Sequence, residues 1–206
     1  MKLKKSKKGE FVPVLRKNKI YFGGFQNMLK DMGVSKFYRD RSCVVTAFTN
    51  TYLYLFKDDE KFSYDEFNDY QYWFFKTLRP KIYGIPTARM LDFKLNRIRK
   101  SYHLRLKSHI LEDLPIKRHS MDQIANFING ALSKDLPVIF FNWLSSSVDV
   151  MKHHGVTITQ LDRKEDDYIL TLSSWGEVYK ISLKEFLNQA RTYTGFIYFE
   201  RDSIVA

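Results

Sequence analysis

The segment Cys43-Val-Val-Thr-Ala-Phe-Thr-Asn-Thr-Tyr-Leu-Tyr-Leu-Phe56 constrains the fold of this chain more than any other segment. Its residues predict a helix of about four turns, with apolar side chains nearly all round the helix axis. Such a helix has no polar face for solvent, so the other elements must pack around it. We therefore expect a buried central helix that begins at Cys43, the only cysteine among 206 residues.

Helical patterns dominate the first two thirds of the chain. Helices are predicted over residues 63–79, 86–100 and 121–132, the second of them opened by its proline. In the first, Ser63 precedes Glu66 by three residues, which is the pattern of a capping box.

Strand patterns follow. Short apolar or alternating runs predict strands over residues 104–107, 137–143, 155–161, 168–174, 177–181 and 195–200, with one short helix over residues 183–190. Helices followed by antiparallel strands are typical of the α+β class. We therefore predict a basic tail and lead-in over residues 1–20 and a single domain over residues 21–206. Its mainly helical lobe covers residues 21–135 and its mainly β lobe residues 136–206.

The composition suits a globular protein of the cytoplasm. Hydrophobic residues make up 44% of the chain and aromatic residues 16%, enough for a sizeable core. A single cysteine cannot form an internal disulfide, which fits a reducing compartment. The basic start of the chain is not followed by the apolar segment of a signal peptide. The most apolar run elsewhere, residues 136–144, is too short to cross a bilayer as a helix, so we expect no transmembrane segment.

The positive charge is concentrated at the N-terminus. Of the net charge of +11, residues 1–20 carry +7 and the other 186 residues only +4. We expect residues 1–10 to be mobile and dispensable for stability. A nucleic-acid-binding module that uses this tail remains an alternative, together with Lys94, Arg97, Arg99, Lys100, Arg105 and Lys107. No nucleic-acid motif accompanies these residues, so no obligate nucleic acid is predicted.

Cys43 and His154 are the candidates for chemistry. A thiol at a helix N-terminus experiences positive partial charge, which favours the nucleophilic thiolate. Arg39 and Arg41 add positive charge nearby. His154 opens a predicted strand, from which an imidazole could act as general base and acid. The alternatives are that Cys43 is a small buried hydrophobe and that His153, on the opposite side of the strand, is the relevant histidine.

Two further polar residues are candidates for supporting roles. Ser173 falls on the next predicted strand, where its side chain could orient the imidazole. Gln26 follows Gly23 and Gly24, a pair that permits close approach of the backbone, and its amide could donate to an oxyanion together with the Cys43 N–H. No cofactor is predicted. The five histidines show no metal-ligand spacing, so no metal site is predicted either.

These segments together resemble the papain-like cysteine peptidase superfamily, and more narrowly the bacterial peptidase-like proteins related to double-glycine leader peptidases. The matching segments are Gly23-Gly24-Phe25-Gln26, Cys43 through Asn50 with Tyr54-Leu55, His154-Gly155-Val156-Thr157-Ile158 and Ser174-Trp175-Gly176. The resemblance implies a papain-like fold and a peptidase that acts on a peptide or protein substrate. Cys43 would be its nucleophile, His154 its base, Ser173 the residue that orients His154, and Gln26 an oxyanion donor.

The chain also departs from the pattern of these relatives. Val44 follows the cysteine where they have Gly, and Gly155 follows the histidine where they have an aromatic residue. Ser173 replaces the usual Asn or Asp, and Gln26 is farther from the cysteine than in papain. A non-catalytic papain-like fold that binds a peptide or protein partner is therefore kept as the alternative function.

Overall fold

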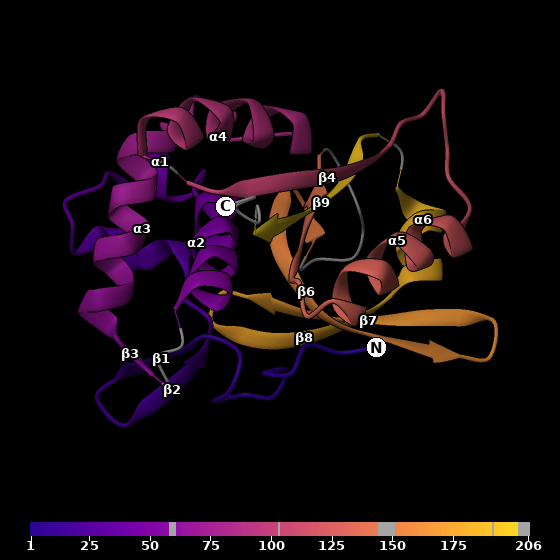
Figure 1. Ribbon diagram of the computed structural model, residues 1–206, viewed down its shortest axis with the longest axis horizontal. Coiled ribbons are helices and arrows are strands. Elements are labelled where there is room, and N and C mark those ends of the chain that lie inside the picture. The colour runs from indigo at the N-terminus through magenta and orange to yellow at the C-terminus, as the bar shows by residue number, and fades with distance from the viewer. Residues whose placement is uncertain (58–60, 103, 144–150, 191, 202–206) are drawn as a thin grey trace, which may run out of the picture.

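The computed structural model describes residues 1–57, 61–102, 104–143, 151–190 and 192–201 (Figure 1). Helix α2 (Cys43–Phe56) has the predicted bounds, and ten of its fourteen residues are buried. It packs against α3 (Tyr64–Leu78) on one side and against strands β5 (Val138–Asn142) and β6 (His154–Lys164) on the other. The prediction of a buried central helix is confirmed, and everything that lines the candidate site is positioned relative to it.

A six-stranded antiparallel sheet forms the other half of the molecule. Its strand order is β4 (Leu106–Asp113), β9 (Thr194–Arg201), β5 (Val138–Asn142), β6 (His154–Lys164), β7 (Asp167–Ser174), β8 (Glu177–Ser182). The α+β class is thereby confirmed. The predicted strand at residues 104–107 is the start of β4, a longer strand that pairs with β9 along its whole length.

Helices cover both faces of this sheet. On β9, Phe199 packs edge-on against Phe48 of α2. Phe196 stacks instead on Phe140 of β5, which in turn contacts Phe186 of α6 (Leu183–Gln189). Helix α5 (Met121–Ser133) packs against β5 and β6. Figure 1 shows α2 on one side of the sheet and α5 and α6 on the other.

The helical side adds α3 (Tyr64–Leu78), α4 (Ala88–Tyr102) and the short helices η1 (Gln26–Lys30) and α1 (Lys36–Arg39). The predicted capping box is present: Ser63 Oγ accepts from Glu66 N, and the Glu66 carboxylate accepts from Ser63 N. Helix α4 begins two residues after Pro86, because the hydroxyl of Thr87 accepts the Met90 N–H.

In the described part of the chain, no helix has the length and hydropathy needed to cross a membrane. That part includes residues 136–143 of the apolar run.

The N-terminal segment is packed onto the domain, contrary to the prediction of a mobile tail. Leu3 is fully buried and its N–H donates to Thr159 O, while the Leu161 N–H donates to Met1 O. Lys8 forms an ion pair with Glu177. The positive charge of this segment suggested a solvated tail. The burial of Leu3 and the backbone hydrogen bonds to β6 instead hold the segment on the domain.

A second, three-stranded sheet follows this segment. Strands β1 (Pro13–Arg16) and β2 (Lys19–Phe22) form an antiparallel hairpin, and the two-residue strand β3 (Phe62–Ser63) joins β1 in parallel. Strand β2 ends directly before Gly23 and Gly24, which lie beside α2. The hairpin therefore positions the segment that carries Gln26.

Candidate active site

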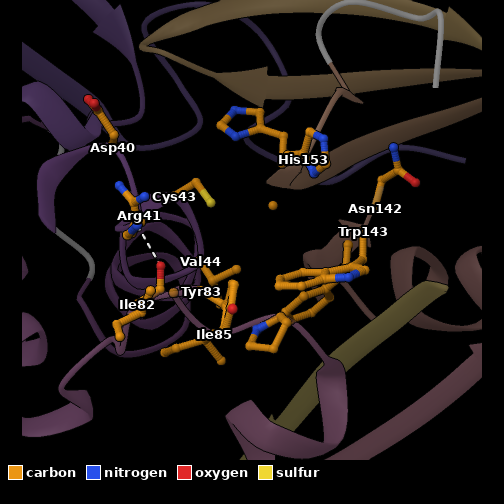
Figure 2. A pocket seen from close by; sticks show the side chains of 15 residues that line it. Asp40, Arg41, Cys43, Val44, Ile82, Tyr83, Ile85, Asn142, Trp143 and His153 are labelled. Atoms are coloured by element: carbon orange, nitrogen blue, oxygen red, sulfur yellow. Dashed lines mark hydrogen bonds between the residues drawn. The ribbon is translucent and has the colours of Figure 1, made fainter. Parts of the chain in front are cut away.

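Cys43 lies at the first position of α2 and lines a cleft of about 270 Å³ between that helix and the start of β6. We call this hollow the cysteine cleft; its walls include Arg41, Tyr83, Trp143 and His154. Figure 2 shows the sulfur of Cys43 pointing into the cleft from the helix, with Trp143 on the opposite wall. The helix N-terminus therefore places the half-buried Cys43 at the wall of the cleft.

His154 is the first residue of β6 and lines the same cleft. Its Nε2 lies 2.8 Å from the hydroxyl of Ser174. Its ring stacks on Trp175, with 4.7 Å between ring centroids and 21° between planes. One ring nitrogen and one ring face are thus held, which leaves Nδ1 for a second partner.

The serine that contacts the imidazole of His154 is Ser174. We had expected Ser173 to orient this imidazole, but its hydroxyl has another partner. The Ser173 hydroxyl donates to Phe22 O at 2.6 Å. In the β6–β7 pairing Ser173 is opposite Thr157, so these two side chains share one face of the sheet. His154 is three residues from Thr157, and alternation places it on the face of Ser174.

Burial moves the pKa values of both candidate groups toward their neutral forms. Desolvation raises the pKa of the Cys43 thiol, although the backbone N–H groups of Gly155, Val44 and Cys43 itself act in the opposite direction. Burial also lowers the pKa of His154 to about 4. At neutral pH the free protein therefore holds a neutral thiol and a neutral imidazole in the same cleft, and the neutral imidazole is the form in which histidine can accept a proton.

The Gly23–Gln26 segment is fitted closely against the helices. Gly23 has a left-handed φ of 77°, and a Cβ on Gly24 would overlap the ring of Phe67. The Gly24 N–H donates to the buried side chain of Asn50 on α2. The glycine pair thus provides the close approach of backbone that its sequence predicted.

Gln26 faces a small hollow next to the thiol. This hollow of about 20 Å³ is also lined by Cys43 and His154, and its size corresponds to about one water molecule. Among the described residues the Gln26 side chain has no hydrogen-bond partner. The structure therefore brings all four predicted residues to this hollow, because Ser173 lines it as well, although the Ser173 hydroxyl donates to Phe22 O and not to the imidazole.

Buried amides on α3 hold this segment and the helix η1 that follows it, and they were not identified from the sequence. Gln71 Nε2 donates to Thr46 Oγ1 at 2.6 Å and to Phe25 O at 3.4 Å. Asn68 Nδ2 donates to Met28 O at 2.9 Å. Two polar residues inside an aromatic-rich helix were the only sequence signal for this role.

Of the two arginines expected near the thiol, Arg41 lines the cysteine cleft, with Nη1 donating to Phe37 O and Nε to Ile82 O. Arg39 instead donates to Val34 O. The described residues, which exclude His103, contain no group of three acidic, histidine or cysteine side chains placed to hold a metal ion.

Comparisons with protein-family models, with curated proteins and with solved structures found no match to this chain.

Proposed function

We propose that this protein is a papain-like cysteine hydrolase that cleaves peptide bonds. The observation that carries the proposal is the shared cleft of Cys43 and His154, in which the imidazole is held by Ser174 and Trp175. A thiol, a neutral imidazole and a group that fixes the imidazole are the components that nucleophilic catalysis by cysteine requires. A reducing cytoplasm would keep the lone thiol available.

In this mechanism His154 acts first as base and then as acid. Nδ1 takes the Cys43 proton as the sulfur bonds to the substrate carbonyl carbon, and the carbonyl oxygen becomes an oxyanion. When the C–N bond breaks, His154 returns the proton to the departing amine. Water then hydrolyses the thioester, which releases the acid and restores the thiol. For Nδ1 to accept a proton, Nε2 must carry its hydrogen and donate it to the Ser174 hydroxyl.

The oxyanion would be stabilised by the Cys43 N–H and the Gln26 amide. Both border the hollow of about 20 Å³ next to the thiol, which has room for about one oxygen atom. Preorganised donors of this kind contribute most when the surrounding loop is rigid. Two hydrogen bonds supply that rigidity: the Gly24 N–H donates to Asn50 Oδ1, and Gln71 Nε2 donates to Phe25 O.

The alternative is a non-catalytic papain-like fold that binds a peptide or protein. Its support was the presence of Val44, Gly155 and Ser173 at positions where the resembled proteins have other residues. Gly155 leaves the space that Val44 occupies, and Ser174 makes the contact to the imidazole. These contacts favour a rearranged but intact site, so the hydrolase is the preferred function.

The test compares His154→Ala with His153→Ala as a matched control, because both histidines line the cysteine cleft. Cys43 is alkylated with iodoacetamide, and peptide cleavage is assayed as new amino termini in a mixed peptide library. We expect wild type and His153→Ala to behave alike, and His154→Ala and Cys43→Ser to lose cleavage. Cleavage that survives Cys43→Ser would contradict the proposal. If the alkylation rate of Cys43 is the same with and without His154, and no peptide is cleaved, the result would support the binding function instead.

A further inference from the structure

A second hollow lies on the helical side and is lined by residues of α4 and of the C-terminal end of α3. Figure 1 shows where these two helices lie in the fold. The hollow encloses about 610 Å³. Its wall carries four cations and two aromatic rings: Lys76, Arg79, Lys94, Arg97, Trp73 and Tyr102. We call it the basic cleft. None of its lining residues belongs to the cysteine cleft.

Within the described part of the chain, the cations of the basic cleft have no acidic partners. Elsewhere in the described residues most ion pairs join a Lys or Arg to an Asp or Glu, and Arg99 of α4 itself pairs with Asp92 at 2.9 Å. None of the ion pairs in that part of the chain includes Lys76, Arg79, Lys94 or Arg97. The basic cleft therefore holds positive charge that an anionic ligand would neutralise.

Lys94 lies deepest in this group and is fixed by the protein. Its ammonium group donates to Leu78 O at 2.6 Å and to Arg79 O at 3.1 Å, which are carbonyls at the end of α3. Desolvation lowers its pKa, and the charges of Lys81, Arg97 and Arg79 lower it further. An anion in the basic cleft would relieve this repulsion.

The aromatic rings give the basic cleft a second kind of contact. Trp73 and Tyr102 meet edge to face, with 5.0 Å between ring centroids, and Tyr102 is 56% exposed. A cationic groove with accessible aromatic faces is the combination that binds single-stranded nucleic acid, because phosphates contact the cations while bases stack on the rings.

We propose that the basic cleft binds single-stranded nucleic acid, with phosphates at Lys76, Arg79, Lys94 and Arg97 and a base stacked on Tyr102. Binding is independent of base sequence, since stacking and phosphate contacts carry little sequence information. The proposal does not depend on the hydrolase function.

The test measures fluorescence anisotropy of a labelled oligothymidylate of about 10 nucleotides. Lys76→Ala with Arg97→Ala removes two exposed cations from helices that tolerate alanine. Arg163→Ala with Lys164→Ala removes two exposed cations from the end of β6 and is the matched control. Circular dichroism establishes that both double variants fold. We expect the first pair to weaken binding at least about tenfold and to reduce the log–log salt slope by about 1.4, which is 0.7 per phosphate contact in a single strand. The control pair should stay within about twofold.

Tyr102→Ala separates stacking from charge. It should weaken oligothymidylate binding about tenfold but leave binding of inorganic polyphosphate, which has no bases, unchanged. Vesicles of phosphatidylserine and phosphatidylcholine form the third arm. The proposal is overturned if oligothymidylate does not bind saturably, if the control pair loses as much affinity as the test pair, or if Tyr102→Ala has no effect. Vesicle binding lost with the cleft cations, without oligothymidylate binding, would assign the cleft to a membrane surface.

Discussion

A Cβ atom placed on Gly155 would lie 2.5 Å from Cγ2 of Val44. Two residues that each depart from the pattern of the resembled proteins therefore occupy one site: the side chain present at position 44 fills the space left by the glycine. Both adjoin the candidate dyad, since Val44 follows Cys43 and Gly155 follows His154. The two departures form one compensated packing arrangement.

Gly155→Ala should destabilise the protein because the new methyl group overlaps Val44. We expect a loss of about 1–3 kcal/mol in the free energy of unfolding, measured in urea. In a Val44→Ala background the same change should cost at least about 1 kcal/mol less, since Cγ2 is then absent. The control is Gly130→Ala in α5, where a Cβ meets nothing within 4 Å; it should stabilise by about 0.5–1 kcal/mol. Equal effects at the two glycines would contradict the compensation.

Ser174→Ala should lower the reactivity of Cys43, whereas Ser173→Ala should lower the stability of the fold. Loss of the Ser174 hydroxyl frees Nε2 of His154 and should lower the alkylation rate of Cys43 about fivefold, the equivalent of a hydrogen bond worth about 1 kcal/mol. Ser173→Ala should leave that rate unchanged but reduce stability by about 1–3 kcal/mol, because Phe22 O loses a buried donor. If Ser173→Ala alone slows alkylation, the assignment of Ser174 is wrong.

The alkylation rate of Cys43 should report the pKa of His154. Because burial lowers that pKa to about 4, the imidazole stays neutral and can accept the thiol proton over most of the acidic range. The rate should remain nearly level from about pH 8 to about pH 5 and fall below that. In His154→Ala it should instead drop about tenfold per pH unit throughout this range, because burial raises the pKa of the thiol above its ordinary value. A wild-type profile that coincides with the variant's would exclude a working dyad.

Stability should also depend on pH through His154. The unfolded chain binds a proton at the ordinary histidine pKa of about 6.5, whereas the folded protein resists protonation until about pH 4. The unfolded state therefore holds more protons between these values, and stability falls as pH falls through this window, by at most about 3 kcal/mol. Above about pH 6.5 His154 is neutral in both the folded and the unfolded state, so stability no longer changes with pH through this residue. Urea unfolding of wild type and His154→Gln at pH 7 and pH 5 measures the difference, which should be smaller in the variant.

Removal of residues 1–10 should lower the melting temperature. Leu3 is fully buried and its N–H bonds to β6, so truncation exposes core surface and leaves backbone groups of β6 without partners. Leu3→Ala alone should cost about 2–5 kcal/mol. Lys7→Ala, at an exposed position in the same segment, is the control and should change stability by less than about 0.5 kcal/mol. An unchanged melting temperature after truncation would restore the original prediction of a dispensable tail.

Local signals were sufficient for much of the secondary structure. The bounds of α2 follow from an apolar run whose pattern repeats within a few residues, and the capping box of Ser63 and Glu66 spans a single turn. Cys43 at a helix N-terminus was predictable for the same reason. The hairpin of β1 and β2 was missed, because its turn carries no glycine and its strands are only four residues long.

The sequence by itself determined the α+β order of elements and the buried central helix, and it nominated Cys43 and His154 as the candidate thiol and imidazole. Only the tertiary structure decided that Ser174 contacts His154, that Val44 fills the space beside Gly155, and that Leu3 joins the core. Those contacts depend on strand register and on packing between distant segments. A shift of one residue in register reverses the face of every side chain, and nothing in the neighbouring sequence records which register the folded sheet adopts.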